Sequence, residues 1–111
     1  MSCLVDMLKS VNPPDALYCY NDTEASMAYE AVQSLDLKVS DDVGIVGTDN
    51  TIAAAAMSPP LTSLDLHAER IGLRAMEMIM SYSDLQHPPQ NTFRLVDSDL
   101  VVRRSCLGPC K

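Results

Sequence analysis

Two pairs of an acid and an amide are the residues in this sequence best suited to bind a small polar molecule. Asn21-Asp22 follows the apolar run 16–20, and Asp49-Asn50 follows the apolar run 43–47. An amide both donates and accepts hydrogen bonds, whereas an ionised carboxylate only accepts them. Asn21 and Asp49 together therefore suit a neutral polyol. The alternative is that Asn21 and Asp22 only cap a helix and Asp49 only forms a turn, and the spacing leaves both interpretations open.

The sequence offers no comparable set of residues for catalysis. Its four glycines never form a GxGxxG or GxxxxGK phosphate loop, and neither His67 nor His87 lies beside a nucleophile motif. The lysines stand at positions 9, 38 and 111, so none follows a late strand as a phosphoacceptor receiver domain requires. We expect no catalytic residue, no cofactor and no metal, and predict that the chain is not an enzyme.

The charge and the apolar runs exclude further classes of partner. The net charge is −7, and the only adjacent cations are Arg103-Arg104, so the sequence lacks the clustered basic face that nucleic acid requires. The first residues resemble no secretory signal, because Asp6 interrupts them before an apolar core forms. The longest apolar run is far shorter than the 18 or so residues of a membrane span. We therefore expect a cytoplasmic protein.

The four cysteines are most simply structural or incidental thiols. Cys106 and Cys110 have three residues between them, but no second pair of Cys or His completes a tetrahedral metal set. Cys19 lies within an apolar run, where a free thiol behaves as a small buried residue. Redox and metal roles remain alternatives, and a reducing compartment fits best.

The elements that position these residues alternate between strands and helices. Apolar spacing predicts the end of a helix over 3–10, a strand over 16–20 that is buried on both faces, and a helix from Asn21-Asp22 to about Asp36. A second buried strand over 43–47 and small apolar residues over 52–57 follow. Those small residues either pack on the sheet or let another subunit approach closely.

The second half predicts an extended segment over 61–64, a long helix capped by Asp65 and ending near Tyr82, and strands over 92–96 and 100–103. The long helix carries two apolar stripes, so it should contact two neighbours. This order indicates an α/β architecture, a parallel sheet flanked by helices, with ligands at the carboxyl ends of the strands.

Four motifs in this order resemble the effector-binding core of LacI/GalR-type transcription regulators. Residues 14–25 look like the family's PDAIFxxNDxxA, and 37–50 look like GLxVPxDVxVVGFDN. Residues 59–64 look like PPLTTV, and 100–106 look like LVVRxSC. The resemblance covers nearly the whole chain, from about Pro14 to Cys106.

The resemblance implies a partial periplasmic-binding-protein-like core that binds a small effector, commonly a sugar or nucleobase. Asn21 and Asp49 match the family's ligand-contacting amide and carboxylate. The helix from Asp22 and the segment 52–57 match its dimerisation surface, so a homodimer or larger assembly is expected. We interpret residues 1–111 as a C-terminal fragment of the effector-binding and dimerisation core, without a helix-turn-helix DNA-binding domain. The alternative is a structural fragment that self-associates without binding an effector.

Several positions depart from the family pattern. Thr48 replaces the usual Phe or Tyr, and Leu66 stands where a ligand-binding Gln is common. Asp36 and Ser40 replace the usual Gly and Pro of a turn, and a non-Gly residue at a left-handed helix end costs on the order of 1 kcal/mol. We therefore expect half a sugar site, and weak or undetectable binding by this chain alone.

Overall fold

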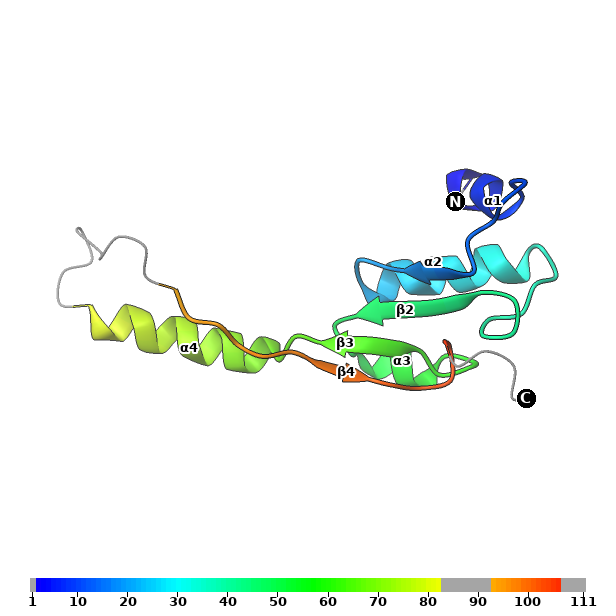
Figure 1. Ribbon diagram of the computed structural model, residues 1–111. Coiled ribbons are helices and arrows are strands. Elements are labelled where there is room, and N and C mark those ends of the chain that lie inside the picture. The colour runs from blue at the N-terminus through cyan, green and yellow to red at the C-terminus, as the bar shows by residue number, and fades with distance from the viewer. Residues whose placement is uncertain (1, 83–92, 107–111) are drawn as a thin grey trace.

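The computed structural model describes residues 2–82 and 93–106 (Figure 1). Helices and strands alternate through most of that length, as the spacing of apolar residues predicts. In chain order they are α1 (Ser2–Leu8), β1 (Ala16–Tyr18), α2 (Asp22–Gln33), β2 (Gly44–Thr48), α3 (Ile52–Ala56), β3 (Thr62–Asp65), α4 (Ala68–Ser81) and β4 (Asp99–Val101).

The four strands form one sheet in the order β1-β2-β3-β4. β1 and β2 are parallel, as are β2 and β3, so the predicted α/β class is confirmed. The expected parallel direction of the last strand is wrong, because β4 runs antiparallel to β3, with Leu64 opposite Leu100. The chain leaves β3, travels out along α4 and returns by the same route (Figure 1), so it re-enters the sheet from the end at which it left.

α2 covers the sheet and forms the core with it. The Asn21 side chain caps this helix by accepting a hydrogen bond from the Glu24 amide at 2.7 Å. Ala25, Ala28 and Val32 recur at helical spacing, and all three are buried against β2 and its neighbours. Asp36, beyond the helix, adopts the left-handed conformation with a φ of 57°. The predicted cap and apolar stripe of this helix are therefore confirmed.

β1 differs from the prediction of a strand buried on both faces. It lies at the edge of the sheet, where Ala16 and Tyr18 are exposed and Leu17 is half-buried. An apolar run can form such an edge when a helix covers only one of its faces. β2 lies inside the sheet, and its Ile45 is fully buried.

α4 and residues 93–98 extend away from the sheet, and we call them the arm (Figure 1). The predicted strand over 92–96 is wrong for residues 93–96, which are irregular, and residue 92 lies outside the described part. A strand needs a partner for its backbone groups, and residues 93–98 run beside a helix instead. Because of the arm the radius of gyration is 18.7 Å, against about 13 Å for a compact chain of this size.

Asp65 does not cap α4, which corrects another prediction. It ends β3, and its Oδ1 accepts a hydrogen bond from the His67 amide at 2.8 Å. His67 is the N-cap residue, in the left-handed conformation with a φ of 52° and no side-chain cap bond. The turn formed by Asp65 and His67 thus delays the start of the helix to Ala68.

Both predicted apolar stripes of α4 exist, and neither is buried. No residue of α4 is buried among the described residues. The exposed large apolar residues of the arm are Ile71, Leu73, Met76, Ile79, Met80, Phe93 and Leu95. Within the described residues, the segment 93–98 runs beside the helix but buries none of its residues, so α4 has one loose neighbour where its sequence predicts two.

Candidate functional site

A shallow hollow lies where β1, β2 and β3 end. Its volume is about 320 Å³, near the lower limit for a small-molecule site. Tyr18, Thr48 and Leu64 come from the strands themselves, and the other lining residues follow directly. The complete lining is Tyr18, Tyr20, Thr48, Asp49, Leu64 and Leu66. The carboxyl ends of the strands thus do gather polar and aromatic side chains, as the architecture predicts.

Asp49 lines this hollow and has an unusual backbone conformation. Asp49 and Asn50 both have positive φ angles, of 98° and 48°. Such a conformation in a residue other than glycine costs about 1–3 kcal/mol and is concentrated at functional sites. Two hydrogen bonds oppose this cost: the Asp49 amide donates to the Leu64 carbonyl at 2.8 Å, and the Asn50 amide donates to Ser63 Oγ at 3.0 Å. The carboxylate is thereby presented at the end of β2.

Asn21 is not among the residues that line the hollow. It is half-buried at the start of α2, and its Oδ1 is occupied by the helix cap. The helix cap uses the side-chain oxygen, whereas a ligand contact could use the side-chain nitrogen, so the two interpretations of Asn21 concern different atoms and are compatible. The structure supports the capping role, and the ligand contact of Asn21 stays a prediction.

Tyr18 and Tyr20 supply aromatic surface that the sequence reasoning missed. Both are exposed, and the Tyr18 hydroxyl forms a hydrogen bond with Thr48 Oγ1 at 2.9 Å. Thr48 is buried and holds this ring at the mouth of the hollow. The alternation of a strand was the available signal, since positions 18 and 20 of an extended run point to the same side.

Asp22 is turned into the protein rather than towards a ligand. It is 2% exposed and accepts three hydrogen bonds: from the Thr51 amide at 2.7 Å, from Thr51 Oγ1 at 2.9 Å and from Ser63 Oγ at 2.6 Å. These bonds tie the start of α2 to the start of α3 and to β3. A Cβ atom on Gly47 would meet Asp22 Oδ1 and would come within 2.9 Å of Leu61, so only glycine fits there.

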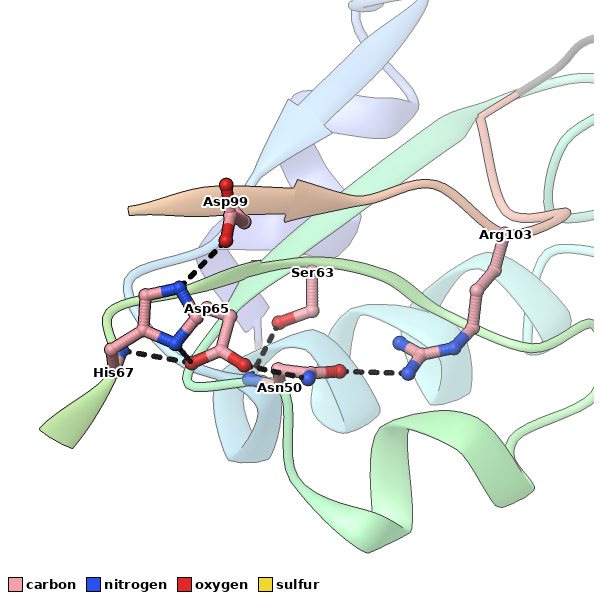
Figure 2. A network of polar contacts seen from close by, with 6 residues as sticks. All are labelled: Asn50, Ser63, Asp65, His67, Asp99 and Arg103. Carbon is pink, nitrogen blue, oxygen red and sulfur yellow. Dashed lines mark hydrogen bonds and ion pairs between the residues drawn. The ribbon is translucent and has the colours of Figure 1, made fainter. Parts of the chain in front are cut away.

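A second polar network joins the sheet to the arm (Figure 2). Asn50 donates from Nδ2 to Asp65 at 3.0 Å, and Arg103 donates from Nη2 to Asn50 Oδ1 at 2.7 Å. His67 Nε2 lies 2.7 Å from the Asp99 carboxylate, and its Nδ1 lies 3.5 Å from Asp65. Hydrogen bonds from the His67 backbone amide, and then from the Asn50 side chain, hold the pKa of Asp65 below its ordinary value. None of these links was predicted. Asn50 and Asp65, Asn50 and Arg103, and His67 and Asp99 are far apart in sequence, and the local bond between Asp65 and His67 replaces the helix cap that was predicted for Asp65.

A larger hollow, of about 630 Å³, lies at the opposite ends of the strands, before β2 and β3 begin. Its lining mixes Lys38, Asp41 and Arg104 with the prolines Pro59 and Pro60. It contains neither predicted site residue, and it faces the amino ends of the parallel strands. We therefore place the candidate site at the smaller hollow.

The described cysteines are free thiols: Cys3, Cys19 and Cys106. Burial, and to a lesser degree Glu24, raises the pKa of Cys19, which makes this thiol less reactive. Cys110, which has three residues between it and Cys106, lies outside the described residues. Within residues 2–82 and 93–106 no group of three His, Cys, Asp or Glu side chains is placed to hold a metal ion. No described helix is long and apolar enough to cross a membrane.

Comparison with known proteins gives consistent results in sequence and in structure. A family model described as a periplasmic binding protein-like domain matches residues 2–106. The HTH-type transcriptional repressor PurR of Aliivibrio salmonicida is 33% identical over 99 residues, which are 89% of this chain and 29% of that repressor. The chain thus spans less than a third of this relative.

Two solved structures show the same fold. A lac repressor dimer bound to operator and the anti-inducer ONPF is 26% identical, with a TM-score of 0.83 over 96% of this chain and 36% of that one. A LacI-type transcription regulator from Bifidobacterium animalis is 30% identical, with a TM-score of 0.78 over 95% of this chain and 37% of that one.

Proposed function

Because the chain belongs to the periplasmic binding protein-like domain family and is similar to LacI-type regulators, we propose that it forms one wall of an effector-binding site. The observation that carries the proposal is the hollow at the carboxyl ends of β1–β3, with the Asp49 carboxylate at its edge. On this proposal residues 1–111 correspond to the C-terminal part of an effector-binding and dimerisation core that works in the cytoplasm. The relatives are named as repressors, and we assign this chain neither a reaction nor contact with operator DNA.

The lining indicates the kind of effector. A tyrosine ring offers an apolar face that suits the C–H face of a sugar or the flat face of a nucleobase. Asp49 accepts hydrogen bonds from hydroxyl or N–H groups, and a bond to a charged acceptor contributes about 1.5–3 kcal/mol. Leu64 and Leu66 add apolar surface, so the effector is a small ring with polar groups on one edge.

The proposal also predicts weak binding. A complete pocket buries about 70–90% of its ligand, whereas a single shallow wall leaves the opposite side in water. We expect dissociation constants in the millimolar range for this chain. Asn21 and Asp49 are proposed as the polar contacts, with Asn21 acting through its amide nitrogen.

NMR titration of the chain with single pentoses, hexoses and nucleobases tests this. With at least one compound, we expect the amide chemical shifts of Tyr18, Asp49 and Leu66 to change at millimolar ligand concentrations. The response at Tyr18 and Leu66 should be lost in Asp49→Ala. Asp41→Ala, at the edge of the other hollow, serves as the matched control. Failure of every compound to shift these amides contradicts a ligand site, and micromolar binding in calorimetry contradicts a half-site.

Self-association through the arm is a second candidate function, and the exposure of both α4 stripes favours it. The proposed partner is a second copy of the chain, because electrostatic repulsion between two copies is smallest along α4. The chain carries −7 overall, whereas α4 balances Glu69 and Glu77 against Arg70 and Arg74.

Light scattering distinguishes the arm from the family's dimerisation surface on α2 and α3, which carries the exposed Ile52. Association through the arm predicts a dimer that Met80→Glu disrupts and Ile52→Glu does not. Association through α2 and α3 predicts the opposite pattern. A dilute wild-type monomer contradicts both.

A further inference from the structure

The Arg103 side chain reaches from the segment after β4 to the turn after β2 (Figure 2). Its Nη2 donates to Asn50 Oδ1 at 2.7 Å, and its Nη1 donates to the Leu61 carbonyl at 2.7 Å. The guanidinium is planar, so two bonds from two of its nitrogens fix both its position and its orientation. The Arg103 amide is also fixed, because it donates to Thr62 Oγ1 at 2.8 Å.

Asn50 is held at both ends of its side chain and at its backbone. The oxygen accepts from Arg103, the nitrogen donates to Asp65 at 3.0 Å, and the backbone amide donates to Ser63 Oγ at 3.0 Å. Each end of the amide thus faces the charge that suits it, so the side chain has one favourable orientation.

The peptide between Asp49 and Asn50 joins two residues with positive φ, and neither of them is glycine. Such a conformation persists only where the surroundings enforce it. Among the described residues the Asp49 carboxylate has no hydrogen-bond partner of its own. Its position in the hollow therefore depends on the backbone that Asn50 and the Asp49 amide fix.

We infer that Arg103 is a positioning residue for the ligand site: through Asn50, it holds Asp49-Asn50 in the left-handed conformation that presents the Asp49 carboxylate to the hollow. A role for Arg103 at a ligand site rests on the proposed function, whereas its effect on the conformation of Asp49-Asn50 is measured without a ligand. It assigns a role at the site to a residue that the lining of the hollow does not include.

Amide hydrogen exchange on the full chain under native conditions tests the inference, together with the three-bond HN–Hα coupling that reports φ. In Arg103→Met we expect exchange at Asp49 and Asn50 to rise at least tenfold, with a changed coupling at both residues. The Ile45 amide, which donates to the Ser105 carbonyl at 2.8 Å, should exchange as in the wild type. Arg103→Lys should restore part of the protection, since an ammonium can still donate to Asn50.

Arg104→Met is the matched control, because the neighbouring side chain lies at the other hollow. It should leave the exchange and the coupling of Asp49 and Asn50 unchanged. Equal acceleration at Ile45, Asp49 and Asn50 in Arg103→Met overturns the inference, because it shows a purely global role. Unchanged values at Asp49 and Asn50 also overturn it.

Asn50→Gly provides a second route if Arg103→Met fails to fold. Glycine adopts positive φ freely and removes the side chain through which Arg103 acts. Exchange at Asp49 in Asn50→Gly should then be insensitive to a further Arg103→Lys, whereas in the wild-type background that change accelerates it. Equal effects of Arg103→Lys in both backgrounds contradict the inference. None of these measurements uses a ligand, so a failure of the proposed function in the NMR titration is distinguishable from a failure here.

Discussion

The sheet with α1–α3 and the arm contain similar apolar residues in very different surroundings. Ile45, Val32 and Leu61 are completely buried around the sheet, whereas Ile79 in α4 is 50% exposed and no residue of that helix is buried. α2 and α4 both carry an apolar stripe, but only α2 has a sheet face to cover. Periodicity therefore indicates which face of a helix can be buried, and the presence of a partner decides whether it is.

The difference extends to how each region is stabilised. Around the sheet, burial of apolar area contributes about 25 cal/mol for each Å² removed from water. α4 has 14 residues, close to the length at which an isolated helix is marginal in water. Its local stabilisation includes the ion pair between Arg74 and Glu77 at 2.7 Å, and such an exposed pair contributes only about 0.3–0.5 kcal/mol.

The same truncation in both regions should produce the largest contrast. Ile45→Ala leaves a cavity beneath α2, so we expect it to lower the free energy of unfolding by about 4 kcal/mol. Ile79→Ala removes a half-exposed side chain, and we expect a change below about 0.5 kcal/mol. Urea denaturation of both variants measures this. A loss of 2 kcal/mol or more, roughly the lower limit for a buried site, in Ile79→Ala would show that the arm is packed.

The same substitution of glycine by alanine should have opposite effects on stability in the sheet region and in the arm. Gly47→Ala forces a methyl group against Asp22 and Leu61, and overpacking of this kind destabilises by about 1–3 kcal/mol. Gly72 in α4 has no atom within 4 Å of the added methyl, so Gly72→Ala should stabilise the helix by about 1 kcal/mol. Thermal melts followed by circular dichroism measure both. A stabilising Gly47→Ala is the outcome that contradicts the close contact.

Alkaline pH should weaken the packing around the sheet through Tyr29. Its hydroxyl donates to the Pro59 carbonyl at 2.8 Å, and burial raises its pKa from 10.0 to about 12. Between these values the folded state keeps a proton that the unfolded state has lost. The Tyr29 contribution is thus complete below pH 10 and is lost as the pH rises through 12. Urea denaturation from pH 9 to 12 should show this decline in the wild type and a smaller one in Tyr29→Phe; equal declines would contradict it.

Acid pH should give the smallest effect, at the junction between the sheet and the arm. The pKa of Asp65 is lowered by the His67 amide and then by Asn50, so its contribution is present above the ordinary value of 3.8. That contribution is lost as the pH falls through the folded value. The difference in unfolding free energy between wild type and Asp65→Asn should shrink between pH 5 and pH 2. A difference that stays constant would show that the carboxylate gains nothing from these bonds.

Much of the sheet region was predictable, because local signals determine it. The cap of Asn21, the stripe of Ala25, Ala28 and Val32, and the second strand all follow from short-range spacing. The position of Asp49 at a strand end was predictable for the same reason. Edge exposure of β1 was not, because an apolar run does not reveal how many strands lie beside it.

The remaining features depend on pairs that only the fold brings together. Asp22 and Ser63, Asn50 and Arg103, and His67 and Asp99 are separated by 41, 53 and 32 positions. The direction of β4 belongs to the same class, since it depends on the route of the arm. Asp65 is an exception to this, because it is a residue type that commonly caps helices. Its carboxylate instead accepts a hydrogen bond from the His67 amide, in the turn before the helix begins.

The bond between His67 and Asp99 lies where both connections to the arm leave the sheet, and this gives it mechanical leverage. Fourteen helical residues extend about 21 Å beyond it. A rotation of about 10° at this pivot would carry the far end of α4 through about 4 Å, because displacement grows with helix length. The His67–Asp99 bond thus lies at the base of the arm, where a small change in orientation produces the largest displacement at the far end of α4.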